Sequence, residues 1–454
     1  MDTRTWKIAI AGEVMATRSF SMHDEPAFIE MIELLRNTDV TYAHLEANIG
    51  DVEELEWAGK GEKLGSFFMV DPKIADDLRW AGIDIVSNAH NHCGDFGASG
   101  VLATRKHCQR AGLACAGTGK DLEEASAPGY LETKKGRVAL VSMASGNHST
   151  DWATLPKGGT KGRPGINPLR TLAKCNVDAD TAKKIKEIGQ KLKILNSKPK
   201  SWMGVDAEKG EFALALKGSG EIKFVESDQC KISCKVYEKD LHRNFRATDE
   251  ANKMADLVLV AHHCSVSEGP RGDTPPVFMR EVAKSVIDAG ADIYLGHGWH
   301  RTLGIEIYKN KPIFYGIGNL FAQSQFLGNV PYDSYEAYGH DVERLSTLNQ
   351  ATFPLHPDIP DKMETWWSSA IAVVEMAGKK ITGMTLHPVE MGRDLTTEME
   401  IRRRTGSGSH PFTEGRPMLA EGKNAYKTLE RIQKLSAELG TNIEIKNGVG
   451  VLKL

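Results

Sequence analysis

The sequence lacks any apolar run that approaches the roughly 20 residues needed to span a lipid bilayer. The apolar stretch within MDTRTWKIAIAGEVM is too short for the hydrophobic part of a signal peptide and continues directly into a strand-like alternation. An excess of one charge is missing too, since 57 lysines and arginines oppose 60 aspartates and glutamates, for a net charge of -3. Without a large basic field, neither nucleic acid nor an anionic membrane is expected as a partner. These absences predict a cytoplasmic protein.

Cysteine is scarce, and its distribution excludes a disulfide-stapled secreted domain. Seven cysteines, an odd number, are scattered over 454 positions. Cys230 and Cys234 lie close together, but no second pair completes a zinc site. Hydrophobic residues at 41% and charged residues at 26% are typical of a folded chain, and no internal repeat or low-complexity segment interrupts it. The chain is therefore expected to fold around a core of its own.

Short apolar runs alternate with longer amphipathic stretches, as in KIAIAG, DEPAFIEMIELLRNT and VTYAHLE. The same rhythm returns from DLVLVAHH to ADIYLGH. Such alternation is typical of βαβ units and predicts an α/β fold with a largely parallel sheet. The next segment, GIEIYKNKPIFYGIGN, predicts a hairpin that turns at Lys309 and Asn310. The tail predicts two more strands and a closing helix.

Two stretches depart from this rhythm within what is interpreted as one domain over residues 1–454. Residues 150–250 contain a Gly-rich basic loop, LPKGGTKGRPG, and a candidate hairpin, GEFALALKGSGEIKFVE. They are interpreted as an insertion and a candidate lid. Residues 320–365 are irregular and rich in aromatic, proline and histidine residues. They are interpreted as a candidate substrate wall.

The predicted strands end in side chains of the types that bind metal ions. In chain order these are Glu13, Glu46, Asn91 with His92, His262 with His263, and His297 with His300. Functional groups of a parallel sheet collect beyond the carboxyl ends of its strands. Carboxylates and imidazoles gathered there would be costly to desolvate unless a cation neutralised them. The number of ligands fits two metal ions better than one, with Glu46 or Asn91 bridging or flanking the pair.

These residues lie in segments that resemble the CapA family, named for poly-γ-glutamate capsule synthesis, within the calcineurin-like metallophosphatase superfamily. The matching segments are AGEVM, HLEANIG, SNAHNHCGDFG, LVLVAHH, LGHGWHRTLGIEIYKNKPIFYGIGN and, near the end, GRPMLAEGKNAYKTLERIQKLSAELGTNIEI. The resemblance implies a four-layer αββα sandwich of the metallophosphatase type with two divalent metal ions, Mn, Zn or Fe. It assigns the metal-binding positions to Glu13, Glu46, Asn91, His262, His297 and His300.

The resemblance also implies a catalytic pair, His92 and Asp95, in an NHxxD arrangement. A carboxylate beside a histidine fixes its tautomer and raises its basicity, as a proton donor to a leaving group requires. Two departures leave room for a substrate other than the capsule polymer: Glu13 stands where the family usually has Asp, and HHC at 262–264 replaces His-Trp-Gly. His263 and His90 are interpreted as supporting or packing residues beside the ligands.

Arginines supply candidate contacts for an anionic substrate. Arg18 follows Glu13, and Arg271 lies on a Gly-rich loop, although an isolated arginine is more often a solvated surface residue. The function predicted is a metal-dependent hydrolase that cleaves an acyl bond (amide, ester or lactone) of a carboxylate-bearing small molecule or γ-glutamyl substrate. The alternatives are a phosphoesterase and a noncatalytic component of poly-γ-glutamate capsule synthesis. Whether the chain forms a homo-oligomer is left open.

Overall fold

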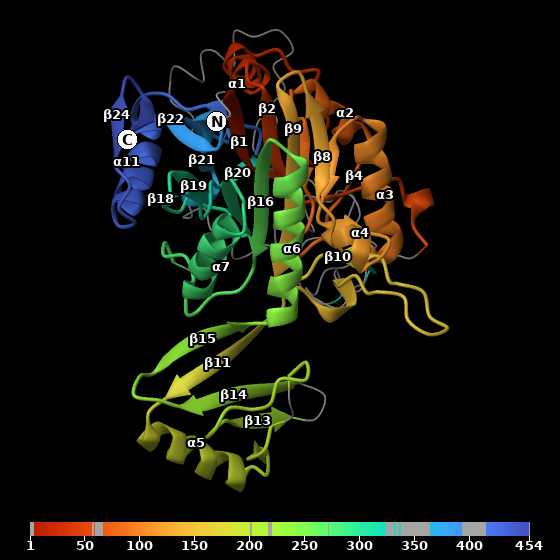
Figure 1. Cartoon of the computed structure of the whole chain (residues 1–454), viewed down its shortest axis with the longest axis vertical. Helices are drawn as coiled ribbons and strands as arrows, with labels where there is room; N and C mark the ends of the chain where they lie inside the picture. Colours follow the sequence, from red (N-terminus) through yellow and green to blue (C-terminus); the bar gives the residue numbers. More distant parts are fainter. Residues whose placement is uncertain are drawn as a thin grey trace.

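The computed structural model describes residues 4–56, 67–199, 202–216, 220–270, 272–323, 364–392 and 415–453, together with positions 59, 331, 332 and 336. Two large sheets form the main body, and a smaller sheet with one helix lies at one end of the molecule (Figure 1). The arrangement is a mixed α/β fold, as the alternation of apolar and amphipathic segments predicts.

The first sheet contains ten strands among the described residues. Its order is β24 (Ile443–Lys446), β25 (Val449–Leu452), β22 (Lys380–Glu390), β21 (Ser368–Ala377), β1 (Thr5–Met15), β2 (Val40–Leu45), β5 (Ile85–Ser87) and β6 (Ala114–Ala116), while β20 (Asn319–Ala322) pairs with β1 and β23 (Met418–Leu419) pairs with β22. The run β1-β2-β5-β6 is parallel, which confirms the βαβ prediction for this part of the chain.

The second sheet contains six strands in the described ranges. Its order is β18 (Ile305–Tyr308), β19 (Lys311–Phe314), β17 (Ile293–His297), β16 (Leu257–Cys264), β9 (Gly136–Ser145) and β8 (Gly129–Thr133). The central strands β9, β16, β17 and β19 run parallel to one another. The predicted hairpin is β18–β19, and Lys309 and Asn310 at its turn have φ of 51° and 59°. Positive φ at both central residues is the requirement of a two-residue type I′ turn, which asparagine tolerates well.

One hydrophobic core fills the space between the two large sheets. Ile8 and Ile10 of β1 belong to the same buried cluster as Leu257 and Leu259 of β16 and Leu295 of β17. Helices cover the outer faces. Strands covered on both faces read as nearly continuous apolar runs, which is why KIAIAG and LVLVA show little polar alternation.

The helices carry apolar residues at helical spacing toward these sheets. Helices α1 (Pro26–Arg36), α2 (Lys73–Trp80) and α3 (Gly97–Arg110) contribute to the core of the first sheet, and α6 (Glu238–Met254) and α7 (Val277–Asp288) to that of the second. The short helix α4 (Leu122–Ser126) precedes β8, the first strand of the second sheet in sequence order. Helix α11 (Gly422–Ala437) packs on β22 and β24 of the first sheet. Among the described helices, none combines the length and apolar character needed to cross a membrane.

The third sheet occupies much of the predicted insertion. It contains β12 (Leu195–Asn196), β13 (Phe212–Leu216), β14 (Gly220–Glu226), β11 (Thr171–Val177) and β15 (Lys231–Val236), with α5 (Ala179–Lys191) beside it. Figure 1 shows this group away from α1, beyond the lower end of α6. The expected hairpin is present as β13–β14. A role of this group as a lid stays a prediction, and most of the candidate substrate wall at 320–365 lies outside the described residues.

Two short strand pairs, one parallel and one antiparallel, contain the remaining strands in the described residues. Strand β3 (Asn48–Ile49) pairs with β4 (Met69–Val70), and β7 (Thr118–Gly119) pairs with β10 (Gly165–Ile166). Single helical turns lie at η1 (Val52–Glu54), η2 (Ser149–Asp151) and η5 (Glu364–Trp366). The pairing of β3 with β4 matters for the site because β3 begins two residues after Glu46, at the end of β2, and holds this part of the backbone in place.

Candidate metal centre

Glu13 is held in β1 by strands on both sides. Its backbone N–H donates to the carbonyl of Gly318 over 3.0 Å, next to β20. The neighbouring residue must be glycine for this approach, because a Cβ on Gly12 would lie 2.0 Å from the Gly318 carbonyl oxygen. The Glu13 side chain is only 1% exposed, and one carboxylate oxygen accepts a hydrogen bond of 2.7 Å from the backbone N–H of Gly298.

Glu46 follows β2 and is fully buried. Its backbone N–H donates to the Val14 carbonyl over 3.1 Å, which fixes it beside the end of β1. Neither of its carboxylate oxygens accepts a hydrogen bond from the residues that the structure describes. Burial raises the pKa of Glu46 above the usual range. Keeping a carboxylate charged at such a buried position costs several kcal/mol unless a cation lies beside it, out of a typical total stability of 5–15 kcal/mol, so this position suits a cation.

His300 lies between these two carboxylates. Its Nδ1 contacts Glu13, and its Nε2 lies 3.8 Å from Glu46 Oε1. The residue has φ of 53°, a left-handed backbone that follows the turn through Gly298 and Trp299 after β17. Burial would lower the pKa of His300, but the charges of Glu13 and Glu46 outweigh it and raise the pKa to about 9. At neutral pH the imidazolium therefore provides positive charge between the two acidic side chains.

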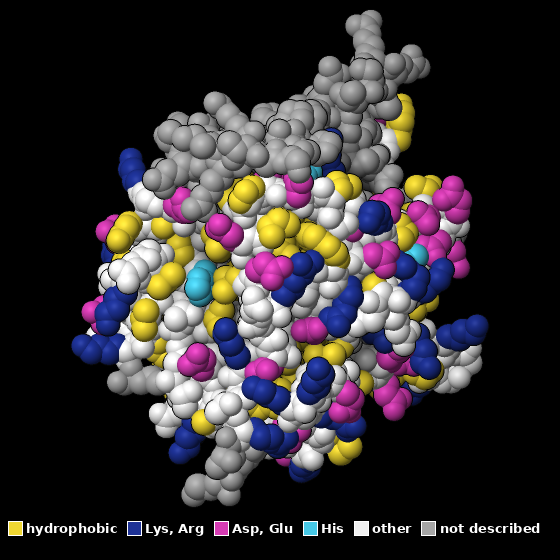
Figure 2. All heavy atoms as spheres, turned by 90° about the horizontal axis from the view of Figure 1, so that it is seen from above, with side chains coloured by type: hydrophobic (Ala, Val, Ile, Leu, Met, Phe, Trp, Pro, Cys, Tyr) yellow, Lys and Arg dark blue, Asp and Glu magenta, His cyan; other side chains and the backbone are white. Residues whose placement is uncertain are grey.

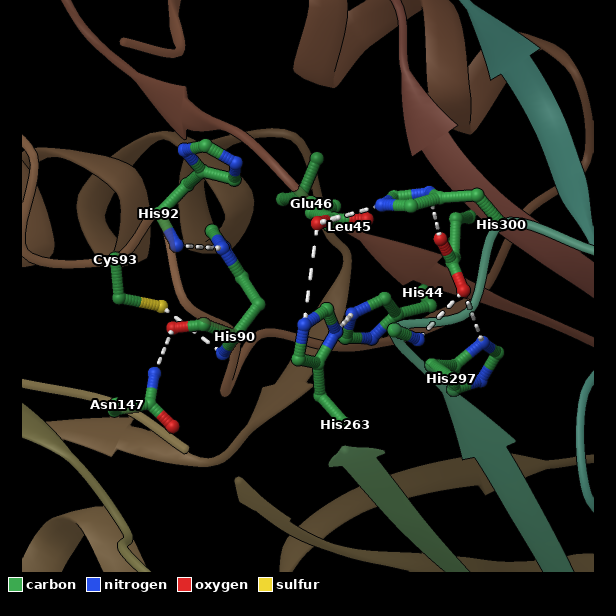
Figure 3. Close-up of polar contacts among 12 residues, drawn as sticks. His44, Leu45, Glu46, His90, His92, Cys93, Asn147, His263, His297 and His300 are labelled. Carbon is green, nitrogen blue, oxygen red and sulfur yellow. Dashed lines mark hydrogen bonds and ion pairs between the residues drawn. The ribbon is translucent and has the colours of Figure 1, made fainter. Parts of the chain in front are cut away.

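The adjacent histidines of β16 point in opposite directions, and this corrects the sequence-based ligand assignment. His262 does not face the carboxylates, because Nε2 bonds Ser145 Oγ and Nδ1 bonds Tyr294 OH, each over 2.8 Å. His263 instead places Nε2 3.9 Å from Glu46 Oε1 (Figure 3). Successive side chains of a strand alternate between faces, so only one of the pair can reach the site. His263 is the ligand candidate, and His262 is a buried structural histidine.

His297 reaches the same site from the neighbouring strand. It is paired in register with His263 across β16 and β17. Its Nδ1 is buried, lies 4.0 Å from Glu13 Oε1 and has no hydrogen-bond partner in the described part of the chain. Burial lowers the pKa of His297 to about 3, and it also lowers that of His263. Both imidazoles are therefore neutral at physiological pH, as a metal ligand must be.

His44 belongs to the site although the sequence argument did not single it out. Its ring lies between His297, at a centroid distance of 4.3 Å, and His263, at 5.0 Å. Strand alternation could have identified it, since His44 and Glu46 are two residues apart and a strand presents such residues on the same face. The sequence analysis interprets His263 as a supporting or packing residue, whereas its position beside Glu46 makes it a candidate metal ligand.

The loop after β5 carries Asn91, His92 and Asp95. Asn91 Oδ1 is buried and has no hydrogen-bond partner among the described residues. His92 Nδ1 lies 2.8 Å from Asp95 Oδ2, and the same carboxylate oxygen accepts a hydrogen bond of 3.1 Å from the Phe68 backbone N–H. Burial would lower the pKa of His92, but Asp95 outweighs it and raises the pKa above its usual value. The expected contact between His92 and Asp95 is present.

Arg18, the one candidate substrate-binding arginine within the described residues, shares its cavity with none of the candidate metal ligands. Arg18 lines a separate cavity of about 400 Å³ together with Lys73 and Arg416. Arg271 lies outside the described residues. Figure 2 shows the molecule from above, and on the described part of this face lysines and arginines are interspersed with acidic side chains. Positive charge is thus local on this face, as the balanced composition predicts.

The carboxylates and histidines form two groups with the spacing of metal ligands. His44, Glu46 and His263 form one group, and Glu13, Glu46 and His300 form the other. Within each group, one potential ligand atom per residue lies within 4.8 Å of the others. Glu46 belongs to both, and Figure 3 shows it between His263 and His300. Both oxygens of Glu46, Asn91 Oδ1 and His297 Nδ1 are buried and have no hydrogen-bond partner among the described residues, and together with the Glu13 carboxylate they fit a pair of cations.

Comparison with known proteins matches residues 7–324 to the model of the bacterial capsule synthesis protein family PGA_cap. The chain belongs to this family. The matched range contains every candidate ligand named above. Over 71 residues the chain is 42% identical to the PGA biosynthesis protein CapA of Bacillus subtilis, a stretch that covers 15% of this chain and 18% of that protein. The resemblance to CapA is therefore confirmed.

Two further relatives extend the similarity along nearly the whole chain. The uncharacterized proteins y4sH and y4uA of Sinorhizobium fredii are each 30% identical over 451 residues, covering 98% of this chain and 92% of theirs. The capsule biosynthesis protein CapA of Bacillus anthracis is 40% identical over 75 residues, which is 16% of this chain and 17% of that protein. Similarity to the two Sinorhizobium proteins thus includes the third sheet.

Proposed function

We propose that this protein is a metal-dependent hydrolase with a dinuclear centre, which cleaves an amide, ester or lactone bond of a carboxylate-bearing small molecule or γ-glutamyl substrate. The observation that carries the proposal is the position of Glu46. Its fully buried carboxylate belongs to both ligand groups, and both of its oxygens are without a hydrogen-bond partner in the described chain. A shared carboxylate of this kind is the ligand that a two-metal site requires.

In this proposal two divalent ions of the Mn, Zn or Fe type would share Glu46 as a ligand. Glu13, His297 and His300 complete one position, and Asn91 and His263 contribute to the other. The two large sheets and the helices on their outer faces are proposed to form an αββα sandwich of the metallophosphatase type. When bound, the ions supply Lewis acidity that activates a water molecule and stabilises negative charge at the scissile group.

Residues of the chain itself complete the chemistry. His92, held by Asp95 over 2.8 Å, donates a proton to the leaving group from its Nε2 atom. Arg18 would bind a substrate carboxylate away from the scissile bond, because the cavity that it lines contains none of the candidate metal ligands. The group formed by β11–β15 and α5 acts as the lid.

Two other functions are supported by particular observations. The relatives named CapA in the two Bacillus species favour a noncatalytic part in capsule synthesis. The metallophosphatase resemblance favours a phosphoesterase. Acyl chemistry is proposed first because the CapA resemblance points to γ-glutamyl compounds rather than phosphate esters.

A substrate panel separates the three functions. The purified protein is treated with a chelator, reloaded with Mn, Zn or Co, and assayed against generic phosphoesters, carboxylic esters, lactones and γ-glutamyl amides. Metal-dependent turnover of an acyl compound is expected. Turnover confined to phosphoesters favours the phosphoesterase, and a metal-loaded protein that turns over nothing favours the noncatalytic role.

Metal binding is expected to release protons at neutral pH. In the metal-free protein the pKa of Glu46 is raised by burial and that of His300 is about 9, so both side chains hold protons at pH 7. Ligands must lose these protons before they bind. Metal affinity should therefore rise with pH until it passes the pKa of His300. Zinc titrations by calorimetry at pH 7, in buffers with different ionisation enthalpies, should show release of about one proton per side chain; identical heats in all buffers would contradict this.

A further inference from the structure

Two of the candidate ligands are joined beneath the site by a continuous chain of hydrogen bonds. His263 Nδ1 lies 2.9 Å from His44 Nε2, and His44 Nδ1 lies 2.6 Å from Ser87 Oγ. Ser87 Oγ lies 2.5 Å from Tyr42 OH, which in turn lies 2.8 Å from His297 Nε2. Each of the five side chains is at most 1% exposed. Figure 3 shows three of its members, with His44 between His263 and His297.

This chain of hydrogen bonds links the two large sheets. Tyr42, His44 and Ser87 come from β2 and β5 of the first sheet, whereas His263 and His297 come from β16 and β17 of the second. His44 uses both ring nitrogens within the chain. This makes it a support for His263 rather than a metal ligand, although it lies within ligand distance of Glu46.

The direction of each hydrogen bond follows from what the two terminal histidines must do. His263 turns Nε2 toward Glu46, and His297 turns Nδ1 toward Glu13. A neutral imidazole has one N–H and one bare nitrogen, so a ring that binds a cation must donate from its other nitrogen. His263 then donates from Nδ1 to His44, and His297 donates from Nε2 to Tyr42.

These two arms converge on one atom. His44, having accepted at Nε2, donates from Nδ1 to Ser87 Oγ. Tyr42, having accepted from His297, donates its hydroxyl proton to the same oxygen. A serine hydroxyl has two acceptor lone pairs and can receive both bonds. If all the hydrogen bonds instead ran from donor to acceptor in the same direction between His263 and His297, one of these two histidines would present an N–H, and not a bare nitrogen, to its metal position.

We propose that Ser87 is a positioning residue that accepts both arms of this chain and thereby sets opposite tautomers in His263 and His297. The inference rests on the proposed dinuclear centre. It implies that His263 binds its ion through Nε2 and His297 through Nδ1. It also implies that the two metal positions depend on one buried hydroxyl, while Tyr42 serves only the position that contains His297.

The tautomers are measured directly in zinc-loaded protein labelled with ¹⁵N at histidine. Long-range couplings between ring nitrogens and carbon-bound protons identify the protonated nitrogen of each ring. The expected result is Nδ1–H for His263 and Nε2–H for His297, with Nδ1–H for His44. The same ring nitrogen protonated in both terminal histidines, or a metal bound to His44, would overturn the proposal without any variant being made.

Variants test the dependence of the two positions. Metal-free protein is dialysed against graded Zn²⁺, and the bound metal is counted. Ser87→Ala is expected to weaken both binding steps by about 10–100-fold, the usual effect of losing a partner of a metal-bound histidine. Tyr42→Phe should weaken one step by a similar factor and leave the other within about threefold.

A matched control is Ser145 of β9, which contacts His262 on the face of β16 turned away from the site. Ser145→Ala removes a buried serine–histidine hydrogen bond of 2.8 Å, that of His262, and is expected to leave both steps unchanged. Wild-type affinity in Ser87→Ala, or equal weakening of both steps in Tyr42→Phe, would exclude the shared acceptor. If the wild-type protein bound no divalent metal, the proposed function itself would fail, which is a separate outcome.

Discussion

Replacing His263 by alanine should remove one of two bound metal ions and reduce turnover by about 10²–10³-fold. Loss of a metal forfeits several kcal/mol of charge stabilisation, and about 1.4 kcal/mol corresponds to each factor of ten in rate. His263 Nε2 lies 3.9 Å from the bridging candidate Glu46. The measurement is the metal content of the gel-filtered protein after saturation with Zn²⁺, combined with turnover of the best substrate from the panel.

The neighbouring residue provides an unusually close control for this experiment. His262→Ala changes the same residue type in the same strand but removes hydrogen bonds to Ser145 and Tyr294 on the other face. It should lower the thermal unfolding midpoint at least as much as His263→Ala and still retain both ions. Full metal content in His263→Ala, or loss of an ion in His262→Ala, would contradict the corrected ligand assignment.

Replacing His92 by asparagine should lower the rate by about 10²–10⁴-fold, the usual contribution of a positioned general acid, while both ions stay bound. Asparagine is close in size but has no titratable proton to donate. The control is His107→Asn, which breaks a histidine–carboxylate contact of similar length, 2.7 Å to Glu54, at a helix outside the site. A fully active His92→Asn variant would remove the proton-donor role.

Asp95 allows the same role to be tested through pH. Burial favours the neutral form of His92, and Asp95 raises its pKa against that effect. A general acid works below its pKa, so Asp95→Asn should move the loss of activity on the alkaline side to lower pH. An alkaline limb that stays in place would mean that another group supplies the proton.

Local patterns explain the parts of the fold that could be predicted. The turn at Lys309 and Asn310 depends on the conformational preferences of a few residues, and β1, β2 and β16 are recognised by short apolar runs. In the third sheet only the β13–β14 hairpin was predicted from such a pattern, and the rest of the sheet was not. Its strand order, β12-β13-β14-β11-β15, is not the order of the chain, and its long-range pairings leave little periodic signal within 171–236.

The sequence alone determined the kinds of candidate ligand and the strands that supply most of them, because apolar runs ending in Glu, Asn or His need no tertiary information to be recognised. Only the tertiary structure decided between His262 and His263. Two adjacent histidines of a strand face opposite sides, and which of them meets Glu46 depends on the pairing of β16 with β9 and β17 and on the packing of the two sheets. The chain through Tyr42, His44 and Ser87 has the same origin, since its members become neighbours of His263 and His297 only when both sheets are assembled.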